Sequence, residues 1–107
     1  MEKLKIDTIK QLIEENKIRW TNHIVIRLLQ RNINQKDIEE ALLNGEILEE
    51  YENDYPYPSC LVYGITTNNK VLHVVCGLNE EELWIITAYY PNSLKWKEDL
   101  KTRKERE

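Results

Sequence analysis

Side chains that can act on a phosphate recur at a regular interval near the start of the chain. His23 and Arg27 lie four residues apart, and Arg31 follows after four more. Residues four apart are neighbours on a helix surface, so one helix would present all three on a single polar strip. An imidazole transfers protons near neutral pH, and a guanidinium holds an anion through paired N–H groups. The spacing indicates acid–base chemistry on an anionic substrate, with His23 and Arg27 as candidate catalytic residues and Arg31 as a candidate binding residue.

The charges around this stretch are arranged in blocks. Five cations and no acid lie from Lys17 to Lys36, and eight acids and no base lie from Asp37 to Asp54. The net charge is -4, whereas nucleic-acid-binding domains are commonly basic. A domain with such polarity can still present a positive face. The alternative for Arg27 and Arg31 is pairing with the acidic block.

A second histidine, His73, lies in the apolar segment 71–76. Alternation along a strand places it on the sheet face opposite Leu72 and Val74. If the helices cover the face of Leu72 and Val74, His73 lies on the other side, where it is a third candidate catalytic residue. The alternative for each histidine is structural: His73 as a half-buried strand residue, and His23 as a hydrogen-bonded residue at a helix start.

Tyr89 lies near the end of the apolar segment 83–90. It is a candidate nucleic-acid-binding residue, because an aromatic ring can stack on a base. Aromatic residues in strands more often belong to the core, which is the alternative. The register across residues 79–82 leaves two arrangements open, in which either Tyr89 or Tyr90 shares the face of His73.

The composition describes one soluble domain spanning 1–107, with 41% apolar and 32% charged residues. No apolar run approaches the ~20 residues of a membrane span, and the N-terminus lacks the apolar segment of a signal peptide. We therefore expect a cytoplasmic protein with no membrane partner.

The residue types also argue against a metal ion or a cofactor. Cys60 and Cys76 lie in apolar segments, which favours buried free thiols. Two histidines, two such cysteines and a diffuse acidic run give no metal-ligand spacing. The three glycines form no phosphate-binding loop. Neither a metal site nor a cofactor is expected.

The apolar pattern predicts helices first and strands afterwards. Residues 1–16 form the first expected helix, with Asp7 as its cap, and 17–20 an extended link. Caps at Thr21 and Asn34 begin two further helices, the first largely buried apart from its polar strip and the second ending at Gly45. Strands are expected at 46–51, 60–67, 71–76 and 83–90, with a hairpin turn at Asn68–Asn69, a short helix around Trp96 and a mobile tail at 101–107. This order predicts an α+β fold with N-terminal helices on one face of an antiparallel β-sheet meander.

Several motifs along the chain coincide with those of one bacterial family. The motifs are Thr21-Asn22-His23 with Arg27, then Arg31-Asn32-Ile33, Asn44-Gly45-Glu46, Asp54-Tyr55-Pro56-Tyr57-Pro58 and Ile85-Ile86-Thr87-Ala88-Tyr89-Tyr90-Pro91. In these the chain resembles the family catalogued as domain of unknown function 4258. The resemblance covers about residues 18–100 and leaves the first helix and the tail as variable parts.

The layout of this family is similar to the RelE/ParE-type toxin fold of small metal-independent ribonucleases. The resemblance implies RNA or the ribosome as a partner, an antitoxin-like protein as a second partner, and cleavage by attack of the ribose 2′-OH on the adjacent phosphate. His23, Arg27 and His73 would then be catalytic, and Arg31 and Tyr89 would bind RNA. The alternative is a non-catalytic protein-interaction module, in which the acidic block and the exposed aromatic residues contact a partner.

Overall fold

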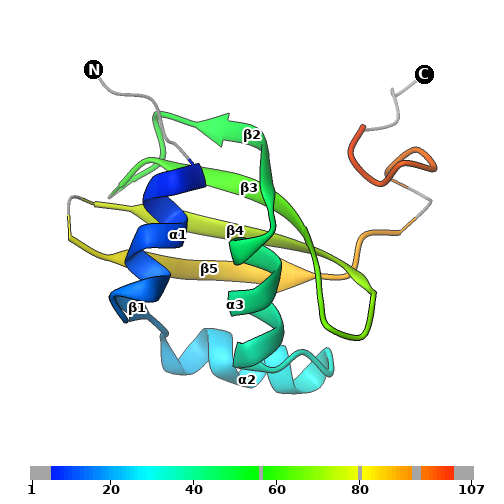
Figure 1. Cartoon of the computed structure of the whole chain (residues 1–107), viewed down its shortest axis with the longest axis horizontal. Helices are drawn as coiled ribbons and strands as arrows, with labels where there is room; N and C mark the ends of the chain where they lie inside the picture. The colour runs from blue at the N-terminus through cyan, green and yellow to red at the C-terminus, as the bar shows by residue number, and fades with distance from the viewer. Residues whose placement is uncertain (1–5, 56, 80, 93–94, 103–107) are drawn as a thin grey trace.

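Five strands form one sheet, and three helices pack beside it, in the computed structural model, which describes residues 6–55, 57–79, 81–92 and 95–102 (Figure 1). The fold is α+β, as predicted. The helices are α1 (Ile6–Glu14), α2 (Asn22–Gln30) and α3 (Gln35–Leu43). The strands are β1 (Ile18–Arg19), β2 (Glu46–Tyr51), β3 (Ser59–Ile65), β4 (Val71–Leu78) and β5 (Leu83–Tyr89).

The sheet has the strand order β1-β5-β4-β3-β2. Strands β2 to β5 form the expected antiparallel meander. β1 pairs in parallel with β5 through Ile18↔Leu83 and Arg19↔Trp84. The sheet is therefore mixed, and the prediction of a purely antiparallel sheet was wrong. The segment 17–20 is extended at Ile18–Arg19, as predicted, but its pairing with β5 was not predicted. A two-residue strand is too short to show the alternation by which strands are identified.

The helices cover one face of the sheet. α3 lies against β3 and β4, and α2 lies along the β5 edge (Figure 1). Leu72, Val74 and Cys76 alternate onto the covered face and are fully buried in the hydrophobic core. His73 therefore lies on the other face, called here the open face, as the alternation predicted.

Two helix starts are fixed by the expected caps. Thr21 Oγ1 accepts a hydrogen bond from Ile24 N at 3.1 Å. Asn34 and Asp37 form a capping box, in which Asn34 Oδ1 accepts from Asp37 N at 2.8 Å and Asp37 Oδ2 accepts from Asn34 N at 3.2 Å. Asp7, by contrast, lies inside the first turn of α1 and does not precede the helix.

Asn34→Ala is expected to lower the free energy of unfolding by about 1 kcal/mol, because the mutation removes one half of the capping box. Urea denaturation followed by circular dichroism measures this loss. Gln35→Ala, at the next position, is exposed and leaves the capping box intact, so its unfolding midpoint should match that of the wild type. Equal midpoints for the two variants would contradict the role of the cap.

Asn69 and Gly45 were both predicted to act at turns, and only Asn69 does so as predicted. Asn69 has a positive φ of 62°, which confirms the hairpin turn. Gly45 has no positive φ, and α3 is capped by Asn44. A Cβ at Gly45 would lie 2.6 Å from Val62 Cγ1 and 2.7 Å from the Ala41 carbonyl oxygen. Gly45 is therefore required for close packing between α3 and the sheet.

The burial of α2 corrects a further prediction. Only Ile24 and Leu28 of this helix are buried, whereas Ile26 and Leu29 are 56% and 74% exposed. α2 lies at the edge of the sheet, so the core contacts it from one side only (Figure 1).

None of the helices in the described part of the chain combines the length and the apolar character that crossing a membrane requires.

The C-terminal segment 95–102 packs on the open face without forming a helix, which corrects the helix expected around Trp96. Trp96 is 2% exposed, and its ring lies 4.5 Å edge-on from the ring of His73. Lys101 Nζ lies 4.7 Å from the centre of the Tyr63 ring and pairs with Glu46. The remainder of the expected tail, 103–107, lies outside the described residues.

Candidate functional site

His23 and Arg27 both lie on the solvent side of α2, where each is exposed. Neither side chain forms a hydrogen bond or an ion pair within the described residues. Pairing of Arg27 with the acidic block, which was the alternative interpretation of this residue, is not present there. Arg27 precedes Arg31 by one helical turn, so these two cations lie near each other on the surface.

His73 lies apart from α2, beneath the C-terminal segment. Its side chain is fully buried, and its Nε2 atom lies 2.7 Å from the Leu100 carbonyl oxygen. A carbonyl oxygen only accepts, so Nε2 carries the proton that is donated to Leu100. The structure therefore brings His73 together with neither His23 nor Arg27, and a direct contact of its imidazole with a substrate would require the C-terminal segment to move.

The sheet register settles which tyrosine shares the face of His73. His73 is paired with Tyr89 across β4 and β5, and the Tyr89 hydroxyl lies 3.4 Å from His73 Nδ1. Since Nε2 donates to Leu100, Nδ1 is the ring nitrogen that faces the Tyr89 hydroxyl. A β-bulge at Ile86 shifts the alternation along β5, which is why the sequence alone left the register open.

Arg31 is held by the backbone and side chain of β5. Its Nη1 donates to Thr87 Oγ1 at 3.0 Å and to the Ala88 carbonyl oxygen at 2.8 Å. The side chain is half-buried and takes part in no ion pair among the described residues. Because a guanidinium has five N–H groups, those on Nε and Nη2 are left without an acceptor in the described part of the chain. Arg31 is thus an oriented cation with unused donors.

A pocket of about 520 Å³ opens beside this guanidinium. We call it the Arg31 pocket, and it is lined by Arg31, Thr87, Tyr89, Tyr90, Asn92, Lys95 and Trp96. It unites the two predicted nucleic-acid-binding residues, Arg31 and Tyr89, although they come from different segments. Sequence reasoning missed Asn92 and Lys95. The signal for Lys95 was the cationic C-terminal block, which has six bases against four acids from residue 95 onward.

Tyr90 contributes a second phenol to the Arg31 pocket. Burial raises the pKa of Tyr90, and the negative charge of Asp37 raises it further. The phenol therefore stays protonated at neutral pH and donates to the Asn32 carbonyl oxygen at 3.3 Å. Lys70 Nζ lies 5.6 Å from the centre of the Tyr90 ring, which places another cation near the rim.

The two cysteines are buried free thiols, as predicted, with their Sγ atoms 3.8 Å apart. The hydrogen bond with Cys60 and burial hold the pKa of the Cys76 thiol well above its usual value. A neutral buried thiol is a poor nucleophile.

Among residues 6–55, 57–79, 81–92 and 95–102, no three His, Cys, Asp or Glu residues are grouped as metal ligands.

The chain was compared with models of protein families, with curated proteins and with solved structures. Residues 20–90 match the family model described as Domain of unknown function (DUF4258). No curated protein and no solved structure matches the chain. The matched range runs from the start of α2 to the end of β5, and so contains both the helix of His23 and the strand of Tyr89. The chain therefore belongs to the DUF4258 family.

Proposed function

We propose that this chain binds RNA, free or on the ribosome, in the Arg31 pocket and cleaves it without a metal ion, as a RelE/ParE-like ribonuclease toxin. The observation that carries the proposal is the anchored Arg31 guanidinium, whose Nε and Nη2 donors have no acceptor in the described part of the chain. RNA offers the complementary group at every nucleotide, a phosphate with two charged oxygens.

The electrostatics of the Arg31 pocket suit a phosphate. Arg31 is oriented by β5, so little side-chain entropy is lost when it binds an anion. Lys95 adds a second positive charge to the pocket wall, and none of the described residues that line the pocket is a carboxylate. Arg27 continues the positive surface by one helical turn, and the exposed imidazole of His23 lies one turn further along α2. These residues would contact the nucleotides that flank the bound phosphate.

The tyrosines provide the second half of the recognition. Tyr89 and Tyr90 both line the pocket, and unstacked RNA bases bind to such rings. His73 Nδ1 lies within hydrogen-bond distance of the Tyr89 hydroxyl and so helps to hold the phenol at the pocket wall. In this arrangement His73 acts through Tyr89 and does not contact the substrate.

The proposed cleavage follows the chemistry of metal-independent ribonucleases. The ribose 2′-OH attacks the adjacent phosphorus atom, and the bond to the 5′-oxygen breaks. Arg31 stabilises the charge that develops on the non-bridging oxygens. One group takes the proton of the 2′-OH, and a second group gives a proton to the leaving 5′-oxygen. Tyr89, which lines the same pocket as Arg31, is one candidate for these roles, and His23 is the other if the RNA extends along α2.

Arg31→Ala is expected to weaken RNA binding about tenfold and to lower the slope of log affinity against log salt by roughly 1, because one phosphate contact is lost. Fluorescence anisotropy of a labelled single-stranded oligoribonucleotide, measured at several salt concentrations, determines both quantities. Lys17→Ala is the matched control. It removes the same charge at the opposite end of β5, where the Lys17 carbonyl oxygen accepts from Leu83 N.

Two outcomes would contradict RNA binding at this site. One is the absence of measurable binding by the wild type, and the other is an equal loss in Arg31→Ala and Lys17→Ala. The ribonuclease step has its own assay, in which the same oligoribonucleotide is incubated with wild type, His23→Ala and Tyr89→Phe. Equal cleavage by all three, or none by the wild type, would leave RNA binding as the proposal and remove the enzymatic part.

A further inference from the structure

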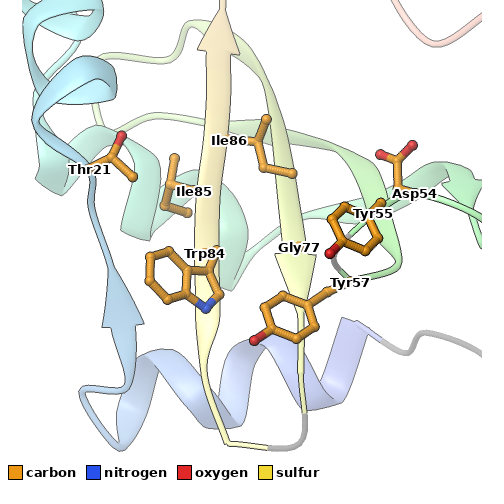
Figure 2. Close-up of a pocket in the computed structure, with 8 residues that line it drawn as sticks. All are labelled: Thr21, Asp54, Tyr55, Tyr57, Gly77, Trp84, Ile85 and Ile86. Atoms are coloured by element: carbon orange, nitrogen blue, oxygen red, sulfur yellow. The ribbon is translucent and has the colours of Figure 1, made fainter.

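A second pocket opens on the open face at the other end of β5 (Figure 2). Its volume is about 450 Å³. The sheet contributes Gly77, Trp84 and Ile86, and the loop between β2 and β3 contributes Asp54, Tyr55 and Tyr57. A Cβ at Gly77 would approach no atom outside its immediate neighbours more closely than 3.5 Å. The glycine thus leaves the floor of the pocket open between the strand and the loop.

The indole nitrogen of Trp84 is a hydrogen-bond donor without an acceptor. Trp84 Nε1 is buried and has no partner among the described residues. Buried donors are normally paired, because an unpaired one loses its hydrogen bond to water without compensation. Figure 2 shows this nitrogen on the edge of the indole ring nearest Tyr57. An oxygen acceptor of a ligand would satisfy it after a small movement of the side chains that cover the nitrogen.

The charge of the pocket favours a cationic ligand. Asp54 is exposed, accepts a hydrogen bond from Ser59 Oγ through Oδ2 and takes part in no ion pair within the described residues. The lining residues within the described part of the chain include no lysine or arginine. Arg19, on the neighbouring β1, is paired with Glu82. A phosphate would meet only negative charge here, whereas a cation meets a carboxylate and the faces of aromatic rings.

We propose that this pocket binds an arginine side chain of a partner peptide. The guanidinium donates to the Asp54 carboxylate and stacks on Tyr57 or Trp84, and its aliphatic stem lies against Ile86. A carbonyl oxygen of the same peptide accepts from Trp84 Nε1. Arginine fits better than lysine, because its planar head stacks on rings and presents paired N–H groups to a carboxylate. The inference does not depend on RNA binding, since the two pockets share no lining residue.

The test follows the indole N–H signal of Trp84 in two-dimensional ¹H–¹⁵N NMR spectra. The signal is identified by its loss in Trp84→Phe. The probe is the capped tripeptide acetyl-Gly-Arg-Gly-amide, which should shift this signal saturably. Asp54→Asn should weaken the binding roughly two- to fivefold, because the ion pair of an exposed carboxylate is lost while the side-chain size is kept. The matched control is Glu52→Gln, an exposed acid that does not line the pocket, which should leave the affinity unchanged.

Three outcomes would overturn the proposal. The first is an unshifted Trp84 signal at saturating peptide. The second is equal binding of the tripeptide in which neutral citrulline replaces arginine, which would remove the role of charge. The third is a shift produced by guanosine monophosphate and not by the arginine peptide, which would make the site a base pocket. Each outcome is independent of Arg31→Ala, so a failure here is distinguishable from a failure of RNA binding.

Discussion

Gly64→Ala is expected to lower the free energy of unfolding by about 3 kcal/mol or more. A Cβ at Gly64 would lie 1.9 Å from the Ala41 carbonyl oxygen and 2.5 Å from its carbonyl carbon. These are backbone atoms of α3, so no rotamer change can relieve the overlap. The helix would have to move away from β3, and the buried Ile38 and Leu42 would lose contact with the sheet.

The neighbouring strand supplies a matched control for this substitution. Gly77→Ala adds the same methyl group on β4, where the nearest atoms are Ile86 Cδ1 at 3.5 Å and the Pro58 carbonyl oxygen at 3.7 Å. Its free energy of unfolding should stay within about 1 kcal/mol of the wild type. Urea denaturation monitored by circular dichroism compares the three proteins. Similar midpoints for the two variants would show that α3 is not held at the distance that the Gly64 contact implies.

Local signals predicted much of the fold correctly, because they act within a few residues. The caps at Thr21 and Asn34 could be predicted because their hydrogen bonds join residues only three positions apart. The alternation of Leu72 and Val74 with His73 gave the correct face of the sheet. β1 was missed because its partner lies more than sixty residues later, at Leu83 and Trp84. No short-range pattern reports such a pairing.

The candidate site was predicted in part for the same reason. The helical spacing of His23, Arg27 and Arg31 could be predicted from the sequence, but the hydrogen-bond acceptor of Arg31 could not. Arg31 is drawn to β5 by Thr87 Oγ1, fifty-six residues away in the chain. The alternation also placed His73 correctly while giving no sign that Trp96 covers it. What covers a strand face depends on tertiary packing, which the periodicity of one strand does not contain.

Charge blocks in the sequence became two oppositely charged pockets in the fold. Arg31 and Lys95 come from the two cationic stretches and line one pocket, whereas Asp54, the end of the acidic block, lines the other. β5 connects them, because it contributes residues to both pockets on the same face. In the two proposals made above, a partner with arginine residues and an RNA strand bind at separate places on one sheet, each avoiding the pocket of its own charge.

Trp96→Ala is expected to cost about 3–5 kcal/mol of stability and to weaken RNA binding as much as Arg31→Ala does. Trp96 fills the space above His73, and the Leu100 carbonyl oxygen accepts from the same imidazole. Loss of the indole leaves a cavity that can collapse only if the segment 95–102 shifts. Lys95 would move with this segment, so the Arg31 pocket would lose its second cation and one wall.

Trp96→Phe separates this explanation from a general loss of structure. The phenyl ring keeps an aromatic edge against His73 and holds the segment in place, so the variant should retain most of the RNA affinity and lose less stability than Trp96→Ala. Urea denaturation and anisotropy with the same labelled oligoribonucleotide provide the two measurements. If Trp96→Ala stays folded and binds RNA as tightly as the wild type, the C-terminal segment is not part of the RNA site. Binding would then depend on Arg31 and the exposed face of α2, which carries His23 and Arg27.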